Sequence, residues 1–166
     1  MAEEMNPLEE LLQDELKDLY SAENQIIKAL PRMAKAASSP ELKRAFERHL
    51  EETRRQVERL EQIGEELEMK LTGKKCAGME GLIAEGKELM GEIDDEDALD
   101  AGLIGAAQKV EHYEIAAYGT ARTHAEVLGY RRIAKLLQQT LNEEGMTDKK
   151  LTQLAESLVN VEAVRG

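Results

Sequence analysis

The chain has 166 residues and a mass of 18.6 kDa, which predicts one domain over residues 1–166. Its 34 acidic and 22 basic side chains give a net charge of −12, so nucleic acid and anionic membranes are not expected partners. The only cysteine, Cys76, excludes an intramolecular disulfide, and the acidic start at Met1 does not resemble a signal peptide. The longest uncharged apolar stretch, 101–108, is far shorter than the ~20 residues that span a bilayer. We therefore expect a cytoplasmic protein without a membrane segment.

The composition favours an all-α fold. Ala, Leu, Glu and Lys are abundant, whereas the chain has one Phe, no Trp and three Pro. Apolar residues from Leu8 to Ala37 recur at spacings of three, four or seven, which predicts a long helix over about 7–37. Ser39 and Pro40 then provide an N-cap and a proline for the first turn of a second helix, which extends to about 69.

Two further long helices are predicted in the second half of the chain. The third extends from about Leu103 to Leu128 and ends at Gly129, and the fourth extends from about Ile133 to Leu158. Residues 70–97 connect the two pairs and include a shorter amphipathic helix. Short turns make each pair an antiparallel hairpin, and the long connection crosses the bundle. The expected architecture is an up-down-down-up four-helix bundle of the ferritin-like kind.

An internal repeat relates the two hairpins. A shift of 91 residues places the apolar positions of the first two helices on those of the last two without a gap across the turn. The same shift places Glu23 on Glu114 and Glu52 on Glu143. Each glutamate lies 14 or 15 residues from its turn, at Ser38 or Gly129, so one carboxylate from each helix is expected at the middle of the bundle, roughly 20 Å from the turns.

A cluster of buried carboxylates predicts bound metal. Several ionised glutamates cannot be buried together unless cations neutralise them, and two divalent ions would balance four glutamates. His49 and Glu111 stand one turn before Glu52 and Glu114, so each can direct a further ligand at the same site. Oxygen donors with imidazole suit iron or manganese better than a structural zinc. We expect two metal ions, iron first and manganese as the alternative. The predicted metal ligands are Glu23, His49, Glu52, Glu111, Glu114 and Glu143.

Several segments resemble the YciF/YciE family of bacterial stress-induced proteins. They cover nearly the whole chain and are Leu19-Tyr20-Ser21-Ala22-Glu23, His49-Leu50-Glu51-Glu52-Thr53, Cys76-Ala77-Gly78-Met79-Glu80-Gly81-Leu82-Ile83, residues 108–116, Tyr118-Gly119-Thr120 and Leu141-Asn142-Glu143-Glu144. The resemblance implies a ferritin-like bundle related to rubrerythrins and manganese catalases, a role in general, osmotic or oxidative stress, and a homodimer.

The chain departs from the wider ferritin-like pattern at two histidines. That pattern has Glu-x-x-His on the second and fourth helices, but Arg55 and Met146 stand three residues after Glu52 and Glu143. His49 precedes its glutamate instead of following it. Glu111 resembles the extra carboxylate of rubrerythrins. Glu144 competes with Glu143, because both lie about 50° from the centre of the apolar face of the fourth helix; the repeat and the resemblance favour Glu143.

These observations leave three functional interpretations. The first is a di-metal carboxylate protein of stress defence, acting on peroxide or dioxygen if it is an enzyme, with no catalytic residue assigned. The second is a non-catalytic helical dimer with a structural metal site or none. The third is an acidic protein that binds basic partners through its surface.

Overall fold

The computed structural model describes residues 4–165, with the side chains of residues 158–160 and 162 left out. The side chain of Leu158, a predicted apolar position, and the residues before Glu4 therefore lie outside the described part. Within that part all regular structure is helical, which confirms the all-α prediction. The helices are α1 (Pro7–Ala36), α2 (Pro40–Glu66), α3 (Ala77–Glu92), α4 (Glu96–Val127), α5 (Arg131–Leu154), a π-helical turn (Ala155–Val159) and α6 (Asn160–Arg165).

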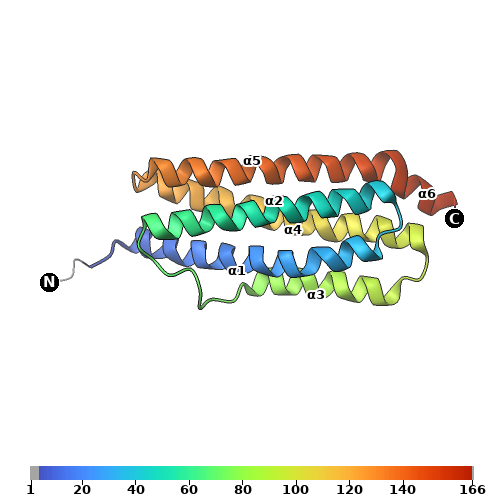
Figure 1. Cartoon of the computed structure of the whole chain (residues 1–166), viewed down its shortest axis with the longest axis horizontal. Helices are drawn as coiled ribbons and strands as arrows, with labels where there is room; N and C mark the ends of the chain where they lie inside the picture. Colours follow the sequence, from blue (N-terminus) through green and yellow to red (C-terminus); the bar gives the residue numbers. More distant parts are fainter. Residues whose placement is uncertain (1–3, 166) are drawn as a thin grey trace.

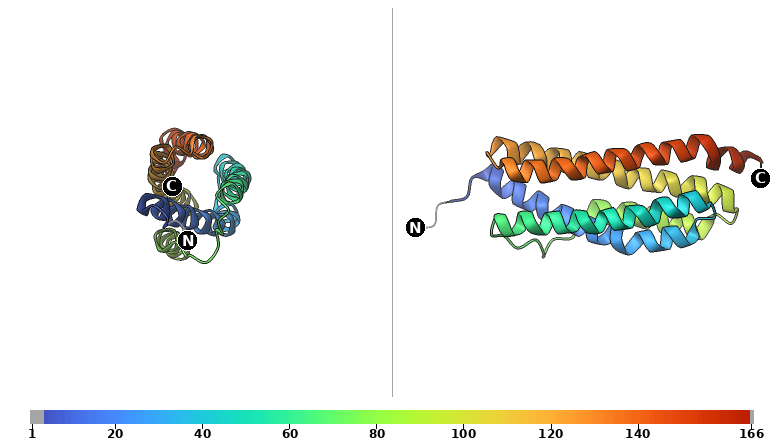
Figure 2. Two further views of the ribbon diagram at one scale, coloured as in Figure 1. Left: turned by 90° about the vertical axis from the view of Figure 1, so that its left-hand side faces the viewer. Right: turned by 45° about the horizontal axis from the view of Figure 1, so that its top comes forward.

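Four of these helices form the bundle. Figure 1 shows α1, α2, α4 and α5 side by side along their lengths, with α1 and α5 in one direction and α2 and α4 in the other. The view along the bundle in Figure 2 places α3 outside the four helices, against α1; α3 also packs on α4. The predicted up-down-down-up topology is confirmed, and α3 is the short extra helix of the crossover. No described helix has the length and hydropathy needed to cross a membrane.

Polar side chains cap the long helices where the sequence changes direction. The Leu42 amide donates to the hydroxyl of Ser39 at 3.4 Å, and Pro40 follows it in the first turn of α2, as predicted. Gly129 has a φ of +81°, a value that suits glycine at the end of α4. Helix α4, the third of the four long helices, begins earlier than the apolar pattern predicts. Asp95 caps it and accepts a hydrogen bond from the Ala98 amide at 2.8 Å.

The buried interior consists of two apolar halves with a polar layer between them. One half lies toward the α1–α2 turn and includes Leu30, Phe46 and Leu103; the other lies toward the α4–α5 turn and includes Leu16, Leu60 and Leu137. The buried polar side chains between them are Glu23, His49, Thr53, Gln56, Glu111, Glu114, Thr140 and Glu144. Every bundle helix contributes to this layer. The fold thus places its costliest buried groups at one level, where the sequence repeat predicts the carboxylates.

Candidate metal centre

Five side chains from all four bundle helices converge at the middle of the polar layer. They are Glu23 of α1, His49 of α2, Glu111 and Glu114 of α4, and Glu144 of α5. Their exposed fractions are 5% or less. They form two groups, His49 with Glu111 and Glu144, and Glu23 with Glu114 and Glu144; within each group one ligand atom per residue lies within 4.8 Å of the others. Glu144 belongs to both groups and therefore lies between two potential ion positions.

The first group is built around the imidazole of His49. Its Nε2 lies 2.8 Å from Glu111 Oε1, and its Nδ1 lies 4.0 Å from Glu52 Oε2. Neither ring nitrogen makes an aligned hydrogen bond with another described residue. A buried imidazole ordinarily satisfies at least one nitrogen in this way. Both nitrogens of His49 thus face acidic oxygens without a fixed hydrogen-bond partner, an arrangement in which a cation can be bound.

The second group contains carboxylates with few hydrogen-bond donors. The Tyr118 hydroxyl donates to Glu23 Oε2 at 3.1 Å. The other Glu23 oxygen, both oxygens of Glu114, both of Glu144 and Glu111 Oε2 are buried and receive no hydrogen bond from a described N–H or O–H group. Leaving one buried acceptor unsatisfied costs about 1–3 kcal/mol, and more for a charged group. Protons or metal ions would compensate such a set of buried acceptors.

The pKa values of these groups show that the cluster contains many buried carboxylates and little positive charge. Burial raises the pKa of Glu23 to about 7. Burial, together with the negative charges of neighbouring glutamates, also raises the pKa of Glu114 and of Glu144 well above the ordinary value. Burial alone would lower the pKa of His49, but the charge of Glu111 and the other nearby carboxylates raise it well above its usual range. Without cations, the cluster must therefore hold protons near neutral pH.

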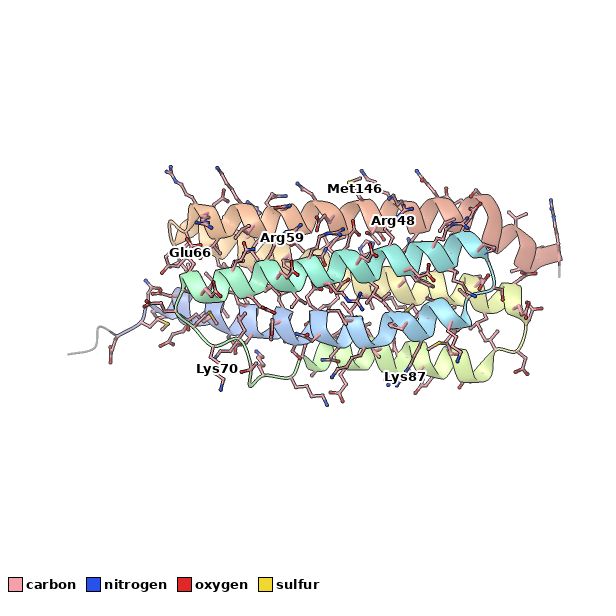
Figure 3. The ribbon with its side chains drawn as sticks, in the orientation of Figure 1. Arg48, Arg59, Glu66, Lys70, Lys87 and Met146 are labelled. Carbon is pink, nitrogen blue, oxygen red and sulfur yellow. The ribbon has the colours of Figure 1, made fainter. Side chains whose placement is uncertain are left out.

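The structure brings Glu144, and not Glu143, into the cluster. Glu143 lies at the seam between α2 and α5, where Arg59 Nη1 and Nη2 donate to its two carboxylate oxygens at 2.6 and 2.8 Å. Gln56 Nε2 also donates to Glu143, at 3.2 Å. Figure 3 shows Arg59 between these two helices. The placement of Glu143 at the centre is therefore corrected to Glu144: the two residues flank the apolar face almost equally, and Arg59 holds Glu143 on the outer side.

Glu52 lies at the edge of the cluster. Its side chain is 24% exposed, and its Oε2 accepts a hydrogen bond from Thr147 at 3.2 Å. The contact with His49 lowers the pKa of Glu52, although burial opposes the shift. The structure thus gathers Glu23, His49, Glu111 and Glu114 as predicted, and it leaves Glu52 next to them, in contact with His49 but outside both groups of three.

One contact of the centre was not anticipated from the sequence. Tyr118 is fully buried and directs its hydroxyl to Glu23. Burial, followed by the charge of Glu23, raises the pKa of Tyr118, so the phenol stays protonated and donates. Its position four residues after Glu114 on one helix is the signal that could have revealed it.

Two openings reach the cluster from outside, and both end on His49 and Glu111. One lies among α1, α3 and α4, and its lining is apolar apart from Arg32, Lys87, His49 and Glu111. The other lies among α2, α4 and α5 and is bordered by polar groups, including Arg48, Glu52 and Lys150. Figure 3 shows Arg48 on the face that α2 and α5 share. A small molecule could approach the same imidazole and carboxylate from either side.

Comparison with known proteins gives a consistent match over the chain. The family model described as Domain of unknown function (DUF892) matches residues 7–164. The protein YciF of Escherichia coli (strain K12) is 51% identical over 160 residues, which are 96% of each chain. The crystal structure of that stress protein superposes with a TM-score of 0.90 over 94% of this chain and 99% of the other. YcfI of Rhodopseudomonas palustris, named as a candidate structural protein, is 44% identical with a TM-score of 0.86 over 92% and 97% of the two chains.

Proposed function

Because this chain belongs to the DUF892 family, whose description states no activity, we propose its function from the chemistry of the buried cluster. We propose that it is a di-metal carboxylate protein of the stress response that acts on dioxygen or peroxide. One observation carries this proposal. At the centre of the bundle, buried carboxylate oxygens and both imidazole nitrogens of His49 have no hydrogen-bond partner among the described residues. The description of the similar YciF as a stress protein supports the physiological part.

The donor set fits two divalent ions. Glu23, Glu111, Glu114 and Glu144 would together carry four negative charges, which two divalent ions balance. The group with His49 would hold one ion and the group with Glu23 the other, and Glu144, which belongs to both groups, would be available to each. Carboxylates with one imidazole suit iron or manganese, whereas structural zinc prefers four nitrogen or sulfur ligands.

The chain's own residues would orient and protonate the reacting groups. A pair of redox-active ions supplies electrons to an O–O bond. Tyr118 fixes the orientation of Glu23 through its hydroxyl, which a ligand in a reactive centre requires. The apolar halves on either side of the polar layer restrict water to the two openings. At the edge of the centre, the half-buried Glu52 can exchange protons with solvent and stands next to His49.

Metal content and turnover test this proposal together. Protein purified without chelators and reconstituted with ferrous or manganous ions should bind two ions per chain and consume dioxygen or peroxide faster than the free metal. Glu114→Gln should lose both properties. The matched control is Glu126→Gln on the same helix, whose side chain is 59% exposed and pairs with Arg122; it should retain both. Fewer than one ion per two chains, or equal binding by the two variants, would overturn the di-metal proposal.

A second candidate function is a non-catalytic protein in which the ions only stabilise the fold. The description of the similar YcfI as a candidate structural protein favours it, and a buried ionic layer can fix helix register. Two bound ions without turnover above free metal would support this function. The expected homodimer is also a proposal, and sedimentation of the metal-loaded chain tests it.

A further inference from the structure

The apolar opening differs sharply from the polar one, although both end on the same two residues. Its walls are apolar side chains of three helices, among them Ile26 and Leu30 of α1, Leu82 and Gly86 of α3, and Ala106 and Ala107 of α4. The exposed Arg32 and Lys87 also border it, and His49 and Glu111 are its only other polar residues. Figure 3 shows Lys87 on α3, away from the bundle axis. The crossover helix thus completes an apolar passage to the imidazole.

The size and lining of this cavity select a small apolar occupant. Its volume of about 40 Å³ leaves no room for an organic substrate of many atoms. A stable buried water needs two to four polar partners, and apolar cavities of proteins stay dry and accept gases such as xenon. Hydrogen peroxide would lose its hydrogen bonds with water on entering, at a cost of several kcal/mol. Dioxygen has no such hydrogen bonds to lose.

We propose that the cavity among α1, α3 and α4 is a binding site for dioxygen next to His49 and Glu111, and that polar reactants use the opening bordered by Arg48 and Lys150. This inference rests on the proposed function, and it selects dioxygen as the substrate that enters from the side of α3. The helix of the crossover then has a role beyond connecting the two hairpins, because it supplies one wall of the gas site.

Xenon is a direct probe of the cavity, because it binds apolar cavities whether or not metal is present. Crystals of the full chain pressurised with xenon should show a xenon peak between Leu82, Gly86 and Ala107. Gly86→Leu should remove the peak. Gly86 lines the cavity, and among the described residues a Cβ added there meets only the Ala106 Cβ, at an ordinary contact distance of 3.8 Å. A leucine side chain at this position should therefore extend into the cavity. Ala106→Leu fills the same space from α4 and provides a second variant should the first fail to fold.

Gly81→Leu is the matched control. Gly81 lies in the same helix and is exposed, and no atom of the described residues lies within 4 Å of an added Cβ. The same substitution there changes helix propensity without touching the cavity. The control should keep the xenon peak of the unmodified chain.

The kinetic test compares two oxidants of the ferrous protein. Each dioxygen takes two electrons from two ferrous ions and two protons from water to become hydrogen peroxide. Filling the cavity should slow oxidation by dioxygen at least about tenfold, and oxidation by hydrogen peroxide under anaerobic conditions should change less than about twofold. An unchanged dioxygen rate in a folded Gly86→Leu or Ala106→Leu protein would overturn the inference.

The outcomes separate this inference from the proposed function. A protein that binds iron but shows no xenon in the cavity overturns the gas site and leaves the di-metal proposal standing. A protein that takes up xenon but binds no metal overturns the di-metal proposal, and with it the role of dioxygen at this site.

Discussion

A short polar stretch in the middle of the α2–α5 seam contains the same contact at each of its two ends, and the 91-residue shift relates these two ends. Glu52 of α2 accepts a hydrogen bond from Thr147 of α5, and Glu143 of α5 accepts one from Gln56 of α2. The shift carries Glu52 to Glu143 and Gln56 to Thr147. The two glutamates are almost equally exposed, at 24% and 23% of their side chains. The sequence repeat therefore specifies a repeated environment at the rim of the centre.

The two ends differ in the cation that faces each glutamate. Arg59 binds Glu143 through two hydrogen bonds, which fixes the carboxylate at the seam. The shift carries Arg59 to the exposed Lys150, which acts on Glu52 by charge alone and contributes, after His49, to the lowered pKa of Glu52. One end is thus clamped, and the other keeps a carboxylate free to turn toward the imidazole.

The inward-facing position is one residue further along each helix. Thr53 and Glu144 correspond under the shift, and both are fully buried. The first hairpin uses a threonine there, whose hydroxyl donates to the His49 carbonyl, whereas the second uses a carboxylate. The difference shows how a duplicated bundle can hold an asymmetric centre: α5 supplies the shared glutamate, and α2 supplies the imidazole.

The largest expected effect concerns the neighbours Glu143 and Glu144. Glu144→Gln should weaken metal binding by more than about 100-fold, since it removes the carboxylate shared by both groups. Glu143→Gln is the matched control, with the same change one residue away, and it should keep two ions per chain. Equilibrium dialysis followed by elemental analysis measures both. Loss of metal in Glu143→Gln alone would show that the clamped glutamate turns inward to bind.

The second prediction concerns pH and the metal-free protein. Glu23 has a pKa of about 7 in the fold against an ordinary value of 4.5, so the folded state binds more protons between these values. The free energy of unfolding should therefore fall as pH rises from about 4.5 to 7, by about 3 kcal/mol for this group. The raised pKa values of Glu114, Glu144 and His49 act in the same direction.

Urea denaturation at several pH values checks this prediction. Saturating metal should remove most of the pH dependence, because the bound ions replace the protons. A metal-free protein that becomes more stable between pH 5 and pH 7 would contradict the buried, cation-poor cluster.

The third prediction breaks the clamped end of the seam. Arg59→Met should lower the free energy of unfolding by about 1–3 kcal/mol, because the charged hydrogen bonds to Glu143 and the one to Thr140 are lost. Lys150→Met at the corresponding position should cost less than about 0.5 kcal/mol. Denaturation of the metal-free proteins measures both. If Arg59→Met and Lys150→Met lowered the free energy of unfolding equally, the difference between the arginine and the lysine would be contradicted.

The smallest expected effect, on metal affinity, comes from giving Glu52 an arginine neighbour like the one that Glu143 has. Lys150→Arg provides a guanidinium where a lysine now acts on Glu52 by charge. It should weaken metal binding severalfold, by about 1 kcal/mol, if the arginine holds that carboxylate away from His49. Lys149→Arg, the adjacent exposed position, is the control and should leave affinity unchanged. Competition with a metal-sensitive dye measures the change. Tighter binding by Lys150→Arg would contradict the proposed freedom of Glu52.

Most of the fold could be predicted from periodicity, because a long amphipathic helix repeats its apolar face over many turns. The turn at Ser39-Pro40 and the end at Gly129 follow from local backbone chemistry, and the topology follows from the length of the crossover. The start of α4 at Glu96 was less visible, because its first residues are mostly acidic or small and the apolar pattern begins only at Leu103.

The sequence predicts which helices contribute to the cluster and most of the residues that each contributes. Glu23, His49, Glu111 and Glu114 lie near the centres of their apolar faces, so helix geometry alone directs them inward. The choice between Glu143 and Glu144 depends on a partner from another helix, Arg59, which no pattern within α5 reveals. Contacts between helices decide such choices, and a single sequence does not report them.

Anomalous diffraction from crystals grown with manganous or ferrous ions is the most direct test of the di-metal centre. Data at the metal edge should show two peaks per chain in the polar layer. Glu144 should lie within bonding distance of both, His49 and Glu111 beside one, and Glu23 and Glu114 beside the other, while Glu143 stays on Arg59. No peak in the layer from a metal-saturated crystal, or a peak bound by Glu143 instead of Glu144, would contradict the centre proposed here.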